Sequence, residues 1–425
     1  MRDSIPMDKV NHPWRIAVAQ IGARRHYAVP VLLHRSGLLE RLFTDLCSAA
    51  GVVRLLEAVV PLACRPRRLT QLLGRRAEGI PPAKIQCFPR FAVKWFIKQR
   101  GVRAPARKLA AWRQANAEFG RLVVRRGLGE ANSVYVFNAA GIEILEHARR
   151  GGMKTIVDQT TAPFAVEETL LAEERERWPG WEFDGTRPEH WRPMAEREEA
   201  EWRLADGIVC GSEFVRQGVL AAGGPVEKCA VVPYGAPSGH IRQTPRVPRP
   251  GPLRVLFVGT VCLRKGIQYL LEAARELGPG DAVFRVVGPI NVTDRALDEI
   301  RKSIDLAGPV PRSAVQQEYD WADVLLMPSI SEGSANVCYE AMAAGLPVVT
   351  TPNAGSVVRD GHEGYVIPIR RADLIVDRLL RFSRDRSLLA AFSENALRRA
   401  REFSWSDYSV RLVEAICAAF GTPAH

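Results

Sequence analysis

The sequence lacks the features of a secreted or membrane-spanning protein. Its first 20 residues contain no apolar run of the kind that forms a secretory signal peptide. The most apolar stretch, residues 55–64, is about half as long as the ~20 residues that a membrane helix requires. We therefore expect a cytoplasmic location.

Paired cysteines and metal-binding patterns are also missing. The eight cysteines are scattered, with no CxxC pair and no histidine at zinc-ligand spacing, and the sequence has no DxD pair of carboxylates. These absences argue against a disulfide framework and a zinc site. We expect reduced, apolar cysteines, no metal and no resident cofactor.

Length and composition are those of a folded, two-domain protein. The chain has 425 residues, which is too long for one ordinary core. Hydrophobic residues make up 47% and charged residues 25%, so disorder, collagen and coiled coil are poor descriptions of the whole.

Positive charge is concentrated in one segment of the chain. The net charge is +12, yet residues 61–130 carry seventeen Lys and Arg against three acids, and the rest sums to about −2. Aromatic residues such as Trp95 and Trp112 are interleaved with these bases. The pattern suits the surface of an anionic membrane, and it fits a solvated basic face with inward aromatics equally well. We expect no nucleic-acid binding, because no RNP, zinc-finger or helix-turn-helix motif accompanies the charge.

Acidic residues gather in a second segment, residues 161–205. It holds twelve acids, six bases and four tryptophans. This composition is unlike that of a simple crossover helix, and the sequence assigns it no role.

Short β-branched runs alternate with helical patterns, which predicts parallel sheets with crossover helices. The expected strands are 16–19, 134–137, 155–157, 207–210, 230–232, 253–258, 283–287, 324–327 and 347–350, and the expected helices of the second half are 266–277, 336–344, 372–382 and 405–420. Five prolines and two glycines in residues 236–252 indicate a linker. We predict an acceptor-side domain over 1–235, a donor-side domain over 253–400, and a terminal helix within 401–425 that packs back toward the first domain.

Two loops that follow predicted strands carry candidate binding residues, since ligands bind beyond the carboxyl ends of parallel strands. The first, GTVCLRKG, places Arg264 and Lys265 at a helix start, where two cations suit a diphosphate. The second places Glu332 in a loop and Glu340 two turns into the next helix, with Ser334 as an expected N-cap. Both patterns also occur without a ligand, because a helix start favours carboxylates and basic pairs are commonly solvated.

In their order along the chain, these motifs resemble the donor domain of glycosyltransferase family 4. The matching pieces are FVGTVCLRKG, VVG at 286–288, the turn LAGPV at 306–310, WADVLLMPS, EGSANVCYEAMAAGLPVVTT, NAGS and DGHEGYVIP. The segment GSEFVRQGVLAAGGPVEKCAVVPYG is similar to the last acceptor-domain helix and strand of that family. The resemblance implies the GT-B architecture, in which two doubly wound Rossmann-like domains face a central cleft, and a retaining transfer from a nucleotide sugar.

The resemblance also implies roles for single residues. Lys265 and Arg264 would bind the donor diphosphate and Glu332 the sugar hydroxyls, while Glu340 would bind the ribose. The remaining donor-site residues are the loop glycine, the backbone near the base and the start of the second helix: Gly259, Gly308, Val310, Gly333, Ser334, Ala335 and Asn336. We expect catalytic roles for Lys265, Glu332 and Asp158.

The sequence departs from the family pattern at three places. Thr260 stands where an arginine is common, Ser334 where an aromatic is common, and Asp158 where a histidine reaches the donor sugar in many members. On the acceptor side, the loop after the first strand offers Gly22, Arg24, Arg25 and His26, and Asn138 follows another strand.

These observations predict a glycosyltransferase that acts on a hydroxyl of a glycan or glycolipid in cell-surface polysaccharide synthesis. Residues 61–130 would hold it against the inner, anionic membrane face. A nucleotide-sugar epimerase of the same fold and a catalytically silent nucleotide-sugar-binding protein remain alternatives.

Overall fold

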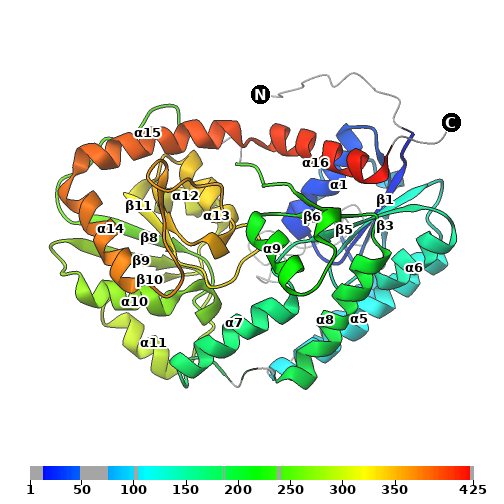
Figure 1. Ribbon diagram of the computed structural model, residues 1–425, viewed down its shortest axis with the longest axis horizontal. Helices are drawn as coiled ribbons and strands as arrows, with labels where there is room; N and C mark the ends of the chain where they lie inside the picture. Colours follow the sequence, from blue (N-terminus) through cyan, green and yellow to red (C-terminus); the bar gives the residue numbers. More distant parts are fainter. Residues whose placement is uncertain are drawn as a thin grey trace, which may run out of the picture.

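Two parallel sheets form the protein, and their order is that of two doubly wound domains (Figure 1). The computed structural model describes residues 13–47, 75–99, 104–183, 185, 187–236 and 241–421. The first sheet has the order β3-β2-β1-β4-β5-β6-β7, with strands Ile85–Cys87, Leu39–Thr44, Ile16–Gln20, Ser133–Phe137, Lys154–Gln159, Gly207–Cys210 and Cys229–Val231. The second has the order β10-β9-β8-β11-β12-β13, with strands Asp305–Gly308, Ala282–Val287, Leu253–Val258, Val324–Met327, Val348–Thr350 and Gly364–Val366. The predicted fold class is confirmed.

Every expected strand is present, with bounds that differ by a few residues at most. The sequence analysis missed four strands, which are β2, β3, β10 and β13. Three of them end a sheet, and β2 and β10 carry charged residues such as Arg41 and Asp305, so they lack the apolar run of a central strand. The expected turn at 306–310 is wrong at its start, because residues up to Gly308 belong to β10.

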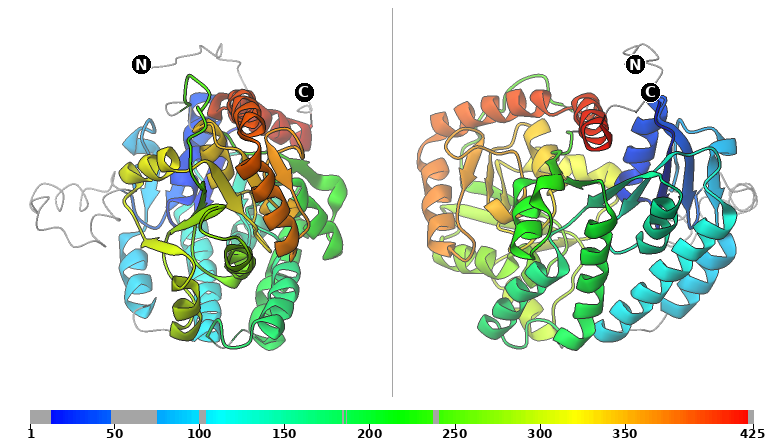
Figure 2. Two further views of the ribbon diagram at one scale, coloured as in Figure 1. Left: turned by 90° about the vertical axis from the view of Figure 1, so that its left-hand side faces the viewer. Right: turned by 45° about the vertical axis from the view of Figure 1, so that its right-hand side comes forward.

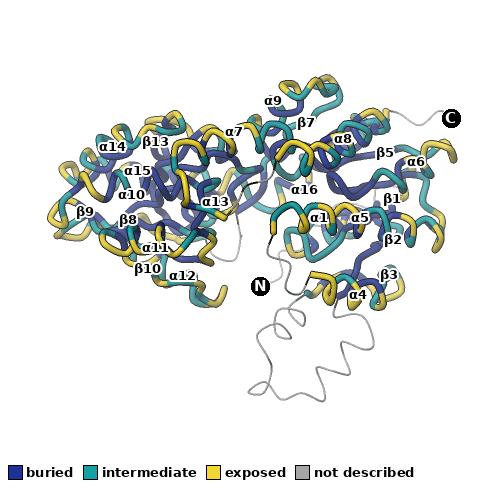
Figure 3. The backbone as a smooth tube through the Cα atoms, turned by 90° about the horizontal axis from the view of Figure 1, so that it is seen from below, coloured by how far each residue is buried: buried dark blue, intermediate teal, exposed yellow. Residues whose placement is uncertain are grey.

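Helices cover both sheets. In the first half they are α1 (Ala28–Arg35), α4 (Pro89–Gln99), α5 (Pro105–Arg126), α6 (Ile142–Arg150), α7 (Phe164–Arg177), α8 (Pro188–Leu204) and α9 (Glu213–Ala221). In the second half they are α10 (Ile267–Glu276), α11 (Asp294–Arg301), α12 (Arg312–Trp321), α13 (Asn336–Ala343), α14 (Ala372–Arg384), α15 (Arg386–Glu402) and α16 (Trp405–Phe420). In Figure 3 the central strands are buried and the exposed residues lie mainly on these helices. None of the described helices is long and apolar enough to cross a membrane.

The last helix, α16, lies against the first sheet although its chain position follows the second. Figures 1 and 2 show α15 and α16 as a red band that passes from one domain to the other. A Cβ atom on Gly207 of β6 would lie 2.5 Å from the Cβ of Ala419, so helix and strand are in close contact. Trp14 and Phe420 also pack edge to face, with ring centroids 4.9 Å apart.

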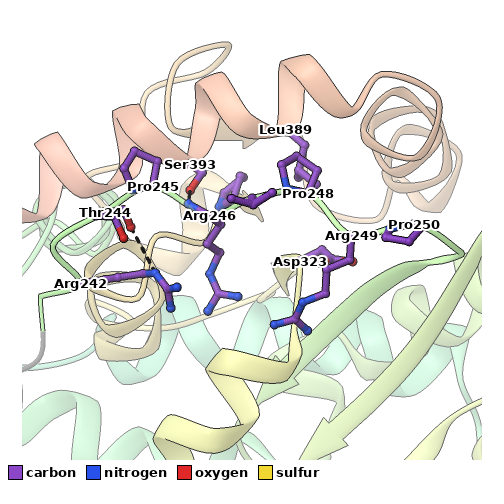
Figure 4. Close-up of a pocket in the computed structure, with 12 residues that line it drawn as sticks. Arg242, Thr244, Pro245, Arg246, Pro248, Arg249, Pro250, Asp323, Leu389 and Ser393 are labelled. Carbon is purple, nitrogen blue, oxygen red and sulfur yellow. Dashed lines mark hydrogen bonds between the residues drawn. The ribbon is translucent and has the colours of Figure 1, made fainter.

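The described part of the linker, residues 241–252, is held on the second domain by arginines. The Arg246 guanidinium donates to the carbonyls of Tyr319, Ala322 and Ala344, which end α12 and α13. Carbonyls at helix ends carry partial negative charge and lack partners within the helix. Burial and the neighbouring Arg242 lower the pKa of Arg246 to about 10. These side chains line a hollow of about 410 Å³ (Figure 4), and the helix ends already occupy the Arg246 donors.

Helix α8 carries two buried carboxylates that cap other helices. Glu201 accepts the backbone N–H groups of Ala139, Gly141 and Ile142, at 2.6, 2.7 and 3.1 Å, where α6 begins. Glu198 accepts the N–H of Phe164, the first residue of α7, at 2.8 Å. Burial raises the pKa of Glu198 to about 7 and that of Glu201 to about 8. Two acids of the acidic segment therefore have a structural role, which the sequence did not reveal.

Replacing Glu201 with alanine should destabilise the first domain. Three backbone N–H groups would lose their acceptor in a buried place, so we expect a loss of about 3 kcal/mol in the free energy of unfolding, measured with urea. Glu196→Ala on the exposed face of α8 is the control and should change stability by less than about 0.5 kcal/mol. Equal effects of the two substitutions would contradict the capping role.

Candidate functional site

The turn before α10 fixes two cations at the start of that helix. Leu263–Lys265 forms a single 3-10 turn, and Gly266 follows with φ of 76°. A Cβ atom on Gly266 would lie 1.9 Å from the carbonyl oxygen of Pro328, so only glycine fits there. The close packing sets Arg264 and Lys265 beside the loop that follows β11.

Both cations contact the carboxylate of Glu332. Lys265 Nζ forms an ion pair with Glu332 Oε2, and Arg264 Nη1 lies 3.4 Å from the same oxygen. Arg264 also donates to the carbonyl of Ser331 at 3.1 Å. Burial and the charge of Arg264 lower the pKa of Lys265 to about 8. We call Arg264, Lys265, Ser331 and Glu332 the cation cluster.

Glu340 lies on the second turn of α13, as the sequence predicted. Its Oε2 accepts the hydroxyl of Tyr319 at 2.8 Å, and the side chain is partly exposed. The predicted N-cap at Ser334 is wrong, because Ala335 occupies that position and makes no side-chain capping bond. The N–H of Ala335 is bonded to the Ala354 carbonyl, so it is not free for a phosphate oxygen. The Ser334 hydroxyl instead lies 3.2 Å from that of Tyr339.

Two glycine loops lie side by side at the ends of β8 and β9. A Cβ on Gly288 would lie 1.9 Å from the Gly259 carbonyl oxygen. Gly288 N–H bonds the carbonyl of Gly308, which ends β10 with φ of 70°. Gly259, Gly308 and the half-exposed Val310 therefore follow neighbouring strands at one edge of the second sheet. Asn336, the first residue of α13, is exposed.

The two domains touch at Gly333, next to the cation cluster. A Cβ on Gly333 would lie 1.8 Å from the carbonyl oxygen of Thr160, which follows β5 of the first sheet. The hydroxyl of Ser212 donates to the Gly333 carbonyl at 2.5 Å. A glycine is therefore required at this contact, and the contact brings the end of β5 to the cation cluster.

Arg25 and Asp158 form a fully buried ion pair. Arg25 Nη2 donates to Asp158 Oδ1 at 2.9 Å, and the hydroxyl of Tyr135 donates to Oδ2 at 2.6 Å. The guanidinium also bonds the Tyr408 hydroxyl of α16 at 2.9 Å and lies 3.8 Å over the ring of Tyr234. Burial lowers the pKa of Arg25, but Asp158 together with Tyr234, Tyr408 and Tyr135 raises it, and the net shift is upward. Both Asp158 oxygens are thus engaged within the protein.

The loop that carries Arg25 has an unusual backbone. Arg25, His26 and Tyr27 have φ of 47°, 52° and 63°, a region that side-chain-bearing residues seldom adopt. His26 contacts Arg312 of α12 in the second domain, and burial together with Arg312 lowers the pKa of His26. Three consecutive residues in this region raise the conformational energy of the folded chain. Backbone strain of this kind clusters at functional sites.

The other predicted acceptor-side residues have different hydrogen-bond partners. Gly22 donates its N–H to Asp45 at 2.9 Å, and Arg24 lies 3.4 Å from the Thr160 hydroxyl at the domain contact. Asn138 is buried and donates to Glu198 at 2.7 Å. Asn138 therefore supports the carboxylate that caps α7.

Sequence reasoning missed a set of first-domain carboxylates that reach the second domain. Glu167 accepts the Ser331 hydroxyl at 2.9 Å, and Glu182 accepts the Leu263 N–H at 2.8 Å. Glu174 accepts hydrogen bonds from the side chains of Gln268, Tyr269 and Arg370. The only signal in the sequence was the acidic, tryptophan-rich composition of residues 161–205. Across the described ranges, no three His, Cys, Asp or Glu side chains converge as a metal site would require.

Comparisons with known proteins show what the second domain is similar to. Residues 252–385 match the family model Glycosyl transferases group 1. The putative colanic acid biosynthesis glycosyltransferase WcaL of Salmonella typhimurium is 34% identical over 50% of this chain and 55% of that protein. The D-inositol 3-phosphate glycosyltransferase of Nocardia farcinica is 30% identical over 51% of this chain and 53% of that protein. The chain spans about half the length of the curated relatives it matches.

Solved structures share the fold over nearly the whole chain. HepE of Anabaena, crystallised with UDP and glucose, covers 95% of this chain and 100% of its own, with a TM-score of 0.61 at 14% identity. Sucrose-phosphate synthase of Thermosynechococcus elongatus matches over 96% of this chain and 99% of its own, with a TM-score of 0.65 at 15% identity. At such identities the likeness shows the fold alone, and it confirms the predicted GT-B architecture.

The pKa of Lys265 makes anion binding at the cation cluster depend on pH. Above pH 8 the ammonium loses its proton, so affinity for a nucleotide sugar should fall between pH 7 and 9, by up to about tenfold per pH unit. The measurement is a titration by calorimetry at each pH. The arginine in Lys265→Arg keeps its charge over this pH range, so the affinity of this variant should not change with pH. Parallel profiles for the two proteins would contradict the assignment.

Proposed function

We propose that this chain, whose residues 252–385 belong to the group 1 glycosyl transferases, transfers a sugar from a nucleoside diphosphate to a hydroxyl of a glycan or glycolipid. The observation that carries the proposal is the cation cluster, which stands at a helix start and directly beside the contact between the domains. Two cations and a carboxylate there match the needs of a diphosphate and its attached sugar.

In this proposal the residues of the second domain bind the donor. Arg264 and Lys265 stabilise the negative charge that develops on the leaving diphosphate, commonly the largest catalytic term. Glu332 accepts hydrogen bonds from sugar hydroxyls, and Glu340 accepts those of the ribose. The backbone of 308–310 lies beside the base. The two cations supply the positive charge, so the proposal calls on no metal ion.

The first domain positions the acceptor. Arg24 lies beside Thr160 at the domain contact and His26 contacts Arg312 of the second domain, which supports a role for both residues on the acceptor side. Asp158 acts through Arg25, because both of its oxygens are engaged there, and it is a positioning residue in this scheme. The acceptor attacks on the face of the leaving group, so that the anomeric configuration is retained.

The named relatives support a role in extracellular polysaccharide synthesis. WcaL is named for colanic acid biosynthesis, and AmsK of Erwinia amylovora, 28% identical over 39% of this chain and 44% of that protein, for amylovoran biosynthesis. HepE was crystallised with UDP and glucose, which supports a nucleotide sugar as the donor here.

An exposed apolar patch with basic neighbours supports a peripheral membrane location. Val93 and Ile97 of α4 are 56% and 61% exposed, and Trp112 of α5 is 45% exposed. A shallow hollow next to them is lined by Pro89, Arg90, Val93, Lys94, Ile97 and Lys98. Apolar side chains among cations suit an anionic lipid surface. The rest of the basic segment, residues 61–74 and 100–103, lies outside the described residues.

A panel of nucleotides tests the donor site. UDP, GDP, ADP and their common sugar conjugates are added in turn, and we expect one base to raise the thermal midpoint of the wild type. Glu340→Ala should lower the affinity for that nucleotide by at least about tenfold, because the ribose hydroxyls lose their hydrogen-bond acceptor. Asp298→Ala, on the exposed face of α11, is the control and should bind as the wild type does.

Product analysis separates transfer from the two alternatives. Conversion of the donor sugar to an epimer without any acceptor would assign an epimerase instead. Binding without transfer or hydrolysis would identify a silent nucleotide-sugar-binding protein. Absence of any nucleotide-induced shift in a folded sample would contradict the donor site itself.

Sedimentation with vesicles tests the membrane patch. The wild type should pellet with vesicles that contain anionic lipid at low salt and be released at high salt. The double substitution Val93→Ser and Ile97→Ser should reduce binding severalfold, because both side chains would lose apolar burial. Leu220→Ser on α9, which is 49% exposed, is the matched control. A wild type that stays in the supernatant at low salt would end this part of the proposal.

A further inference from the structure

Helix α7 belongs to the first domain by sequence and packs against both domains. It starts just after β5 and runs under the second domain toward α10 and α11 (Figure 1). Glu174 accepts Gln268 Nε2 at 2.7 Å and the Tyr269 hydroxyl at 2.8 Å on α10. After the helix, Trp181 and Gly180 bond Thr293 at the start of α11. The first domain thus holds the donor-binding domain through one helix and its following loop.

The first turn of this helix reaches the cation cluster. Glu167 Oε2 accepts the Ser331 hydroxyl at 2.9 Å, and the carbonyl of the same serine accepts Arg264 Nη1 at 3.1 Å. The next residue, Glu332, contacts both Arg264 and Lys265. Glu332 therefore pairs with both cations directly, and Glu167 of the other domain is linked to Arg264 through Ser331.

The charges at this place balance only when no donor is bound. Arg264 and Lys265 contribute two positive charges, and Glu167 and Glu332 contribute two negative ones. A diphosphate would add at least two further negative charges in a partly buried place, where like charges repel strongly. Burial raises the pKa of Glu167, while Arg264, the Ser331 hydroxyl and Lys265 lower it and Glu168 raises it. Glu332 has a proposed partner in the donor sugar, but Glu167 gains none.

We propose that Glu167 is a counter-charge that competes with the donor diphosphate for Arg264 and Lys265. Donor binding then adds negative charge near the Glu167 carboxylate, and the affinity for the donor is lower than the two cations alone would give. This inference rests on the proposed function, because it takes the cation cluster as the diphosphate site. It gives the first domain a direct influence on a ligand that the second domain binds.

Matched neutral substitutions on α7 test the competition. Glu167→Gln keeps a hydrogen-bond acceptor for Ser331 and removes the charge, and Glu173→Gln removes a charge from an ion pair with Arg370 on the same helix. The probes are inorganic pyrophosphate and the nucleotide sugar selected by the panel, titrated by calorimetry. We expect Glu167→Gln to bind both at least about fivefold more tightly than the wild type. Glu173→Gln should bind as the wild type does, and Glu167→Ala should follow Glu167→Gln.

The outcomes distinguish this inference from the proposed function. Equal affinity of Glu167→Gln and wild type, with binding that still depends on Lys265, would overturn the role of Glu167 and leave the donor site standing. Weaker binding of the nucleotide sugar with unchanged pyrophosphate binding would also overturn it, and would place Glu167 on the sugar. A wild type that binds neither probe would remove the donor site and this inference together.

Discussion

The buried ion pair between Arg25 and Asp158 holds together four parts of the chain that are distant in sequence. Arg25 lies in the loop after β1, Asp158 on β5, Tyr234 at the approach to the linker and Tyr408 on α16. A charge in such a place is tolerated only with a partner and further hydrogen bonds, which limits how these segments can be arranged. The pair therefore fixes the strained loop and the returning helix against the first sheet, and with them the geometry of the domain contact.

Other carboxylates of the first domain also have partners that are distant in sequence. The acids of residues 161–205 are unlike a solvated acidic face. Glu198 and Glu201 cap helices. Glu167, Glu174 and Glu182 accept hydrogen bonds from the second domain. Helix N-termini and arginine side chains supply the positive charge with which these carboxylates interact. Among the described residues, the domains are thus joined by the linker with α16, the contact at Gly333, the contact between His26 and Arg312, and the acidic helix α7.

This arrangement connects donor binding with domain geometry. The proposed diphosphate site lies where α10 begins, and two first-domain carboxylates lie beside it: Glu182 accepts the Leu263 N–H of that turn, and Glu167 accepts the Ser331 hydroxyl. A ligand that changes the charge there acts on contacts between the domains as well as on its own domain. Where polar contacts join two domains beside a ligand site, ligand binding and domain geometry become energetically coupled.

The sequence by itself determined the architecture, the central strands and the loop that carries the basic pair, because apolar runs, glycines and basic pairs are local patterns with a physical cause. Gly333 and Gly266 are such cases, since each packs against another backbone. Edge strands such as β10 escaped notice because half-exposed strands lack a continuous apolar run. Only the tertiary structure decided the partners of the buried charges. Asp158 pairs with a residue 133 positions away, and Glu167 with one 164 positions away, and no local pattern encodes a contact over such distances.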